Sequence, residues 1–246
     1  VEPTLVLHGA PFAGAGNGLL SCLTVPPSRV VVVDRAGGGD SLAAAVDAAV
    51  ARLQGDGRRV AVVAPGACMD EAVPGAATLF FDVLRNEADA AAASQSRGAA
   101  ASFCFRHVVI DAGTGLTAAT FAALNSRLPP SRRKRVTAVL VAGTREEWET
   151  RRRRARDVVA ELCGGDTTDE DDDWLRVVEP PFGKAFGSVR RAGVEAVRDI
   201  ARTQGIVADP LYSAKAFAVA AEMVASDTSD GAEGGWEAGA AGGGRA

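Results

Sequence analysis

Residues 111–119 read Asp-Ala-Gly-Thr-Gly-Leu-Thr-Ala-Ala and join an apolar, β-branched run to a segment of helix-forming residues. A strand, a glycine loop and a helix in this order present unpaired backbone N–H groups at the positive end of a helix dipole, where phosphate binds well. Gly113 and Gly115 let the backbone approach an anion, and Thr114 and Thr117 can add hydroxyl donors. The segment is neither a P-loop nor a dinucleotide-binding G-x-G-x-x-G loop. Taken alone, it indicates a phosphate site and an ordinary glycine-requiring βα turn equally well.

Tyr212 is the single tyrosine of the chain, and it follows the short apolar run 206–208 and the turn residues Asp209 and Pro210. A helix is expected to begin near Ser213. This pattern places Tyr212 at the carboxyl end of a strand, which is the edge of an α/β sheet where ligands bind. A tyrosine there can donate a proton or hold a carboxylate. Without further information, a tyrosine that simply packs at the rim of the sheet is the favoured interpretation.

The two segments together resemble a known family of enzymes. Residues 205–216 are similar to the G-[IV]-x-x-D-P-[VM]-Y-[TES]-x-K-[AS] segment of D-cysteine desulfhydrases and 1-aminocyclopropane-1-carboxylate (ACC) deaminases. These are fold type II, tryptophan-synthase-β-like enzymes that use pyridoxal 5′-phosphate (PLP). Residues 111–119 resemble the D-A-G-T-G-T-T-A phosphate loop of the plant-type D-cysteine desulfhydrases. Two motifs in the family's order are much more specific than either one, and the resemblance covers most of residues 4–224.

The resemblance implies a phosphate subsite in the glycine loop. The PLP phosphate would be bound by the backbone N–H groups of Gly113, Thr114, Gly115, Leu116 and Thr117. Leu116 stands where the family has serine or threonine, so one hydroxyl donor is missing. Because backbone donors make most of the contacts, we expect a weakened affinity and not an abolished one.

The resemblance also implies roles on the substrate side. Tyr212 would lie beside the substrate, where it holds the carboxylate or assists proton transfer. Ser213 falls where the family has threonine or glutamate near the pyridine nitrogen, and a serine favours a neutral ring and elimination chemistry. ACC deaminases carry a second active-site tyrosine in the region that corresponds to residues 181–187, where this chain has Phe182 and Phe186. This difference favours the desulfhydrase branch.

The lysine that links the cofactor in this family has no counterpart in these 246 residues. The family carries it in a G-N-K-x-R-K-L motif near the N-terminus, whereas the lysines here are Lys134, Lys184 and Lys215. The late H-T-G-G loop is missing as well, and the chain starts at Val1 without a methionine. We therefore expect an N-terminally truncated enzyme. Without that lysine, the cofactor has no covalent attachment and the α-proton has no base.

These observations favour a PLP-dependent lyase that eliminates the β-substituent of a small amino acid, such as D-cysteine, to give pyruvate, sulfide and ammonia. The fragment itself is expected to be inactive, so whether this chain is an enzyme stays open. An alternative is a non-catalytic remnant of the fold that binds phosphate or a protein partner. A third hypothesis, a small-molecule-binding α/β module unrelated to PLP, leaves the Tyr212 motif unexplained. The expected partners are a small amino-acid substrate and a second copy in a homodimer.

The chain alternates between short apolar runs and helical patterns, which predicts an α/β fold with a mostly parallel sheet flanked by helices. Most of the runs are continuously apolar, as expected for strands buried on both faces of such a sheet. The expected strands are residues 4–8, 30–33, 59–63, 107–110, 136–141, 175–178 and 206–208. The expected helices are residues 41–53, 71–86, 116–127, 145–163, 189–203 and 213–225. The resemblance makes this the fold of a type II PLP enzyme without its N-terminal part.

We expect one incomplete enzyme domain over residues 1–225, with low-complexity insertions at residues 87–102 and 164–173. Residues 226–246 are rich in glycine and alanine, and they are expected to form a disordered tail. The arginine run 151–154 is interpreted as a solvated helix face.

Composition excludes several classes of function. The net charge of -4 gives no support to nucleic-acid binding. The 4 cysteines form no C-x-x-C pair and the chain has 2 histidines, so no metal site is expected. No stretch reaches the roughly 18 apolar residues of a membrane span, so no membrane partner is expected either. Scattered single cysteines fit a reducing intracellular compartment, with the mitochondrion and the plastid as candidates.

Overall fold

The computed structural model of the chain describes residues 1–9, 16–34, 38–96, 104–165, 172–181, 183 and 189–229. Its contacts divide the chain into two compact units, Val1–Val62 and Val63–Ala246. The expectation of a single enzyme domain over residues 1–225 stays a prediction. Within the described residues, no helix is both long and apolar enough to cross a membrane.

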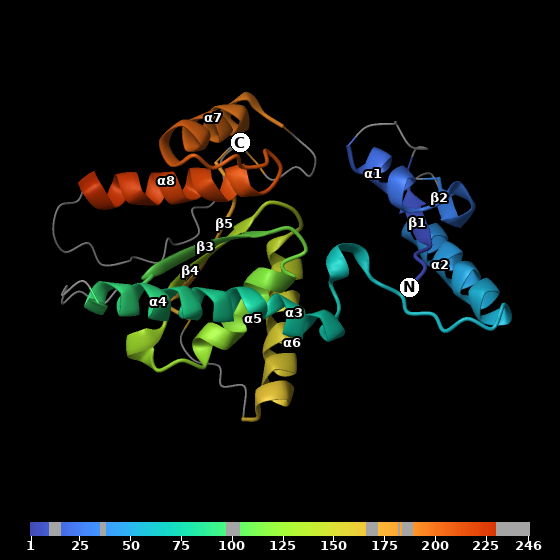
Figure 1. Cartoon of the computed structure of the whole chain (residues 1–246), viewed down its shortest axis with the longest axis horizontal. Helices are drawn as coiled ribbons and strands as arrows, with labels where there is room; N and C mark the ends of the chain where they lie inside the picture. The colour runs from blue at the N-terminus through green and yellow to red at the C-terminus, as the bar shows by residue number, and fades with distance from the viewer. Residues whose placement is uncertain are drawn as a thin grey trace, which may run out of the picture. The chain divides into compact units, whose positions relative to one another are not determined.

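The first unit contains a pair of short parallel strands (Figure 1). Its strands and α-helices are β1 (Leu5–His8), α1 (Gly16–Thr24), β2 (Val30–Val33) and α2 (Gly38–Gly55). Leu5 lies opposite Val30, and α2 contacts both strands. Both strands and α2 confirm the sequence predictions, although α2 begins at Gly38 and not at residue 41. Helix α1 was not expected, because its first residues Gly-Asn-Gly have low helix propensity.

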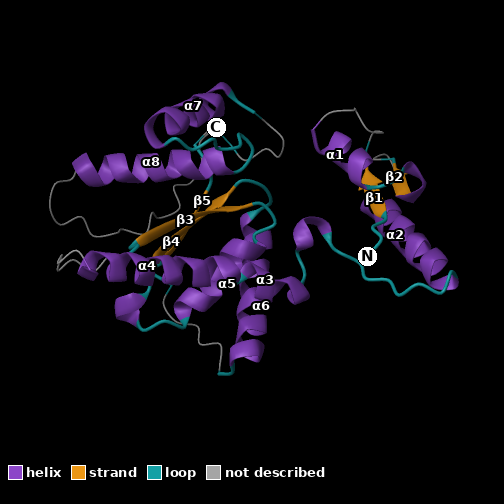
Figure 2. Cartoon of the chain, in the orientation of Figure 1, coloured by secondary structure: helices purple, strands orange, loops and turns teal. Residues whose placement is uncertain are grey.

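The second unit is built on a three-stranded parallel sheet in the order β3-β4-β5 (Figure 2). Its strands are β3 (His107–Ala112), β4 (Arg135–Leu140) and β5 (Leu175–Val178). His107 pairs with Arg135 and Val136 pairs with Leu175. All three strands therefore point the same way, and their carboxyl ends meet at one edge. These strands and their direction confirm the predicted mostly parallel α/β class.

Two further runs that were predicted as strands are not strands. Residues 59–63 and 206–208 pair with no described strand, and Val63 and Val207 are 70% and 87% exposed. A β-branched run forms a strand only where a neighbouring strand accepts its hydrogen bonds and covers its side chains. Neither run has such a neighbour among the described residues.

Six α-helices accompany this sheet in the described residues. They are α3 (Val73–Ala76), α4 (Thr78–Ser96), α5 (Leu116–Ser126), α6 (Arg145–Cys163), α7 (Arg191–Gln204) and α8 (Ser213–Ser229). Helix α6 has the predicted bounds, and α5, α7 and α8 differ from the predictions only at their ends.

The predicted low-complexity segments are only partly described. Helix α4 continues to Ser96, so residues 87–96 of the insertion expected at residues 87–102 are helical. Alanine is the best helix former, which explains the continuation. Of the insertion expected at residues 164–173, residues 166–171 lie outside the described residues. The expected tail starts inside α8, and its remaining residues 230–246 also lie outside them.

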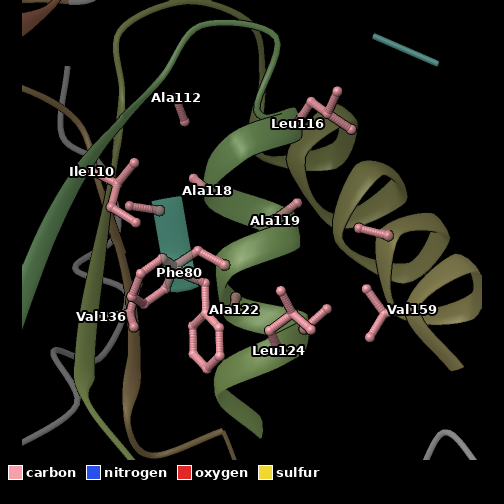
Figure 3. Close-up of a cluster of buried hydrophobic side chains, with 14 of the residues drawn as sticks. Phe80, Ile110, Ala112, Leu116, Ala118, Ala119, Ala122, Leu124, Val136 and Val159 are labelled. Atoms are coloured by element: carbon pink, nitrogen blue, oxygen red, sulfur yellow. The ribbon is translucent and has the colours of Figure 1, made fainter. Parts of the chain in front are cut away.

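Helices cover both faces of the three-stranded sheet (Figure 1). On one face, Ile110 of β3 and Val136 of β4 pack toward Phe80 of α4 and Ala118 of α5 (Figure 3). Buried alanines of α5 bring this helix close to the sheet and to α6, and they are Ala118, Ala119, Ala122 and Ala123. On the other face, Val139 packs with residues of α8 and of the segment that directly precedes this helix. The close packing fixes where the loops after β3 and β4 lie.

Candidate functional site

The loops that follow β3 and β4 enclose a cavity of about 430 Å³ at the carboxyl edge of the sheet. Residues 64–68 and the first two turns of α6 form its other walls. The lining residues are Ala64, Pro65, Cys68, Ala112, Gly113, Thr114, Gly115, Leu140, Ala142, Gly143, Thr144, Glu147, Trp148 and Arg151. Cavities of this volume hold small molecules and cofactors. The core of the predicted phosphate loop, Gly113, Thr114 and Gly115, therefore faces a ligand-sized space.

The N-terminus of α5 has no side-chain cap. Gly115 occupies the cap position with a φ of 83°, and it has no side chain that could accept an N–H bond. By contrast, Thr144 Oγ1 at the start of α6 accepts the N–H of Glu147 at 3.1 Å, and the Glu147 carboxylate accepts the N–H of Thr144 at 2.7 Å. The first N–H groups of a helix need an acceptor from outside the helix. The start of α5 is thus left open to an anion.

The preceding loop packs directly against the phosphate loop. Gly66 has a φ of 64°, and a Cβ at this position would lie 2.5 Å from Thr114 Cγ2. The thiol of Cys68 donates a hydrogen bond to the carbonyl of Thr114 at 3.6 Å. Only glycine at position 66 allows this approach, so residues 64–68 help to fix the conformation of Thr114.

The structure brings Tyr212 against the phosphate loop. A Cβ built on Gly113 would lie 3.1 Å from Cε1 of the Tyr212 ring, which is tighter than most side-chain contacts. Tyr212 is half-buried, and it packs with Val139 of β4 and Val219 of α8. The two motifs from distant parts of the sequence thus meet at Gly113. This contact is the geometric basis for treating them as one site.

Replacing Gly113 by alanine is expected to displace the Tyr212 ring, because the added methyl group requires space that the ring occupies. Tyr212 is the only tyrosine, so its ring proton resonances report the displacement without ambiguity. We expect shifted ring resonances and a loss of about 1–2 kcal/mol in the free energy of unfolding, as for other overpacked sites. Gly75→Ala is the matched control, because a Cβ there meets nothing within 4 Å. Unchanged Tyr212 resonances in Gly113→Ala would contradict the contact.

Asp209 organises the chain around Tyr212 and the start of α8. Its carboxylate accepts the backbone N–H groups of Leu211 at 2.9 Å, Tyr212 at 2.8 Å and Ser213 at 3.0 Å. The Ser213 hydroxyl donates to the same carboxylate and accepts the N–H of Asp209 at 3.0 Å. Ser213, the residue predicted to lie near the pyridine nitrogen, therefore already has a partner for its proton within the chain.

A second carboxylate lies close to this network. Asp111 is the second-last residue of β3, just before the phosphate loop, and it is half-buried. Burial raises its pKa above the usual aspartate value, a hydrogen bond from its own backbone N–H opposes the shift, and the charge of Asp209 adds to it. Asp111 therefore holds a proton more tightly than an exposed aspartate does.

Two residues of the predicted phosphate set lie outside the cavity lining. The side chain of Leu116 is buried in the core, so only its backbone N–H can serve a ligand. Thr117 is exposed, and it does not line the cavity. The contribution predicted for the Thr117 hydroxyl stays a prediction.

The two lysines that the structure describes do not line the cavity. Lys134 is buried and pairs with the Glu87 carboxylate at 2.6 Å. Lys215 is 1% exposed, and its Nζ has no hydrogen-bond partner among the residues that the structure describes. Lys184 lies outside the described residues. No group of three or more potential metal ligands occurs in the described part of the chain.

Helix α6 contributes a wall of the cavity that the sequence patterns did not predict. Thr144, Glu147, Trp148 and Arg151 line the cavity, and their spacing places them on one face of the helix. The interpretation of residues 151–154 as a solvated face holds for Arg153 and Arg154, which are exposed, but not for Arg151 and Arg152, which are partly buried. The position of α6 in the chain could have predicted this wall, because a helix that directly follows a parallel strand starts at the ligand-binding edge of the sheet.

The sheet and its helices have the fold of a type II PLP-dependent enzyme. The chain superposes on the crystal structure of an ACC deaminase homologue with a TM-score of 0.66 and 19% sequence identity, over 91% of this chain. This likeness establishes the fold class that the sequence predicted.

The sequence comparison points to the same family. Over 128 residues, 50% of this chain, the sequence is 30% identical to a rice (Oryza sativa subsp. japonica) protein named "Putative D-cysteine desulfhydrase 2, mitochondrial". No protein-family model matches the chain. The chain spans 31% of the length of the rice protein and 61% of the solved homologue. The fold and the sequence match together confirm the resemblance to the D-cysteine desulfhydrase and ACC deaminase family.

Proposed function

We propose that this chain binds pyridoxal 5′-phosphate through the loop after β3, as part of a D-cysteine desulfhydrase-like lyase. The observation that carries the proposal is the uncapped start of α5, which faces a ligand-sized cavity and lies next to Tyr212. A phosphate group would accept the N–H groups that no side chain of the chain satisfies. The likeness to the rice protein and to the ACC deaminase homologue supports the choice of PLP over other phosphates.

The residues of the site would have separate roles in binding the cofactor and the substrate. The backbone of Gly113, Thr114 and Gly115 holds the phosphate, and the N–H groups of Leu116 and Thr117 complete the set. When bound, PLP supplies an electron sink that makes the α-proton of an amino acid acidic.

On the other side of Gly113, Tyr212 is placed to bind the substrate carboxylate or to move a proton. Ser213 would meet the pyridine nitrogen, and its hydroxyl would have to turn away from Asp209 to donate there.

The parent reaction would be β-elimination from a small amino acid such as D-cysteine, with pyruvate, sulfide and ammonia as products. The sequence contains no G-N-K-x-R-K-L motif, and the two described lysines, Lys134 and Lys215, do not line the cavity, so the 246 residues would bind PLP reversibly without turnover. A non-catalytic phosphate-binding or partner-binding role is the alternative, and the same missing lysine favours it. A mitochondrial location is part of the proposal, supported by the name of the rice protein, and so is a homodimer.

Reduction with borohydride followed by peptide mapping tests this proposal. The purified chain is equilibrated with PLP, dialysed, and reduced in parallel with a protein of the family that has the lysine motif. We expect saturable binding to this chain, no adduct on Lys134, Lys184 or Lys215, and no sulfide from D-cysteine. Absence of binding would refute the proposed function. A reduced adduct on one of the three lysines would refute the claim that this chain lacks a cofactor-linking residue.

A further inference from the structure

Arg151 differs from the three arginines that follow it in the sequence. Arg152 pairs with Glu149 at 2.9 Å and also with Asp172, and Arg154 pairs with Asp70 at 2.5 Å. Arg153 is exposed, and its Nε donates to the carbonyl of Glu149 at 3.4 Å. Each of these three guanidinium groups has a partner within the chain.

The side chain of Arg151 makes no hydrogen bond within the described part of the chain. Its Nε is buried without a partner among the described residues, and its charge attracts Asp70 through space, whose carboxylate Arg154 already holds. A buried guanidinium N–H without an acceptor is costly, because it has lost its water and gained nothing. An acceptor that enters from outside the chain would complete this hydrogen bond.

The position of Arg151 indicates where that group binds. Arg151 lines the same cavity as the phosphate loop, and its Cγ would lie 3.7 Å from a Cβ built on Gly115. Gly115 is the N-cap of α5, so the arginine side chain passes beside the uncapped helix start. The carboxylate in the cavity, that of Glu147, accepts the N–H of Thr144 and is committed to capping α6.

We infer that Arg151 binds the phosphate group of the ligand, opposite the backbone N–H groups of the glycine loop. The site would then select phosphorylated ligands by two independent elements, a helix N-terminus and a guanidinium that forms charge-assisted hydrogen bonds. This inference rests on the proposed function for the identity of the ligand, but it requires only a phosphate group at the loop.

Binding of inorganic phosphate and PLP to the full chain tests the inference. The variants are Arg151→Gln, Arg151→Lys and, as a matched control on the same helix, Arg153→Gln, which removes the same charge from an exposed position. We expect Arg151→Gln to weaken both ligands about ten- to a hundredfold, as for the loss of a hydrogen bond to a charged group. Arg151→Lys should recover part of the affinity, because it keeps the charge and loses the planar fork. Arg153→Gln should bind like the wild type, and unphosphorylated pyridoxal should not distinguish the variants.

The outcomes separate this inference from the proposed function. Equal phosphate affinities of Arg151→Gln and Arg153→Gln, with unchanged circular dichroism, would overturn the role of Arg151. Phosphate binding that depends on Arg151, without any PLP binding, would keep the anion site and refute the proposed function. A wild-type chain that binds neither ligand would overturn both.

Discussion

Replacing Lys215 by methionine is expected to raise the free energy of unfolding at pH 7 by about 1–3 kcal/mol, the typical cost of a buried polar group without a partner. Lys215 is 1% exposed and lies on α8, and its Nζ makes no hydrogen bond to any described residue. Methionine fills a similar volume without a charge, so the packing of α8 is retained. Denaturant unfolding of the two proteins measures the difference.

The gain from Lys215→Met should depend on pH in a defined direction. Burial lowers the pKa of Lys215, the nearby Arg190 lowers it further, and Asp209 opposes the shift. At pH values between the lowered pKa and the usual lysine pKa of about 10.4, the unfolded chain therefore binds more protons than the folded chain. The stability of the wild type therefore rises with pH in that window, and the advantage of the methionine variant shrinks.

Lys134→Met is the matched control, because it makes the same substitution at the other buried lysine described. Lys134 donates to both oxygens of Glu87, at 2.6 and 2.8 Å, and the pair is largely buried. Removing the lysine leaves a buried carboxylate without its partner, so we expect a loss of about 3–5 kcal/mol. Stability changes of the same sign in the two variants would show that Lys215 has a partner in solution.

Replacing Asp209 by alanine is expected to lower the free energy of unfolding by about 1–2 kcal/mol, the usual cost of losing a helix cap. Its carboxylate accepts three backbone N–H groups and the Ser213 hydroxyl. Without it, the start of α8 loses its acceptors and Tyr212 loses the bond that positions its backbone. Weaker ligand binding should accompany the lower stability, because Tyr212 packs against Gly113 in the phosphate loop.

The contribution of Asp209 to the free energy of unfolding should disappear in acid. Partial burial raises its pKa, but hydrogen bonds from Ser213, Tyr212 and Leu211 outweigh burial and hold the pKa below the usual value. Its stabilising effect is therefore present above the ordinary aspartate pKa of about 3.9 and is lost as the pH falls through the lower folded value. Ser213→Ala, which leaves the three backbone bonds in place, should cost less. If the difference in the free energy of unfolding between Asp209→Ala and the wild type does not narrow in acid, the stabilising role of the ionised Asp209 is contradicted.

The local pattern of the sequence was sufficient for the strand, glycine loop and helix at residues 107–127. Continuous apolar residues, then glycines, then alanines determine this unit almost without tertiary help. Its meeting with Tyr212 followed from the order of the motifs and from the rule that parallel strands end at one edge. The detail that Gly113 admits the Tyr212 ring required the folded chain.

Other features depend on partners that a sequence pattern does not show. Residues 59–63 and 206–208 have strand-like composition, but no neighbouring strand among the described residues pairs with them. The four arginines at residues 151–154 are identical in the sequence, and only the turn of α6 separates Arg151, at the cavity, from Arg153, in solvent. The acceptors that pair Arg152 and Arg154 come from distant segments, at Asp172 and Asp70.

A basic groove away from the cavity is a competing candidate for the phosphate site. An open groove of about 770 Å³ lies at the other ends of β3 and β4, and its lining includes Arg106, Arg132, Arg133 and Arg135. It contains positive charge but no helix start beside a tyrosine. A ligand attracted by charge alone would bind there, whereas our account places it at the glycine loop.

Amide chemical shifts of the ¹⁵N-labelled chain during titration with PLP decide between the two places. Our account predicts that the largest saturable shifts occur at Gly113, Thr114, Gly115 and Leu116, and that the Tyr212 ring resonances move with the same apparent Kd. Shifts concentrated at residues 104–107 and 131–135, with the glycine loop unchanged, would contradict the central claim that the loop and Tyr212 form one PLP-binding site.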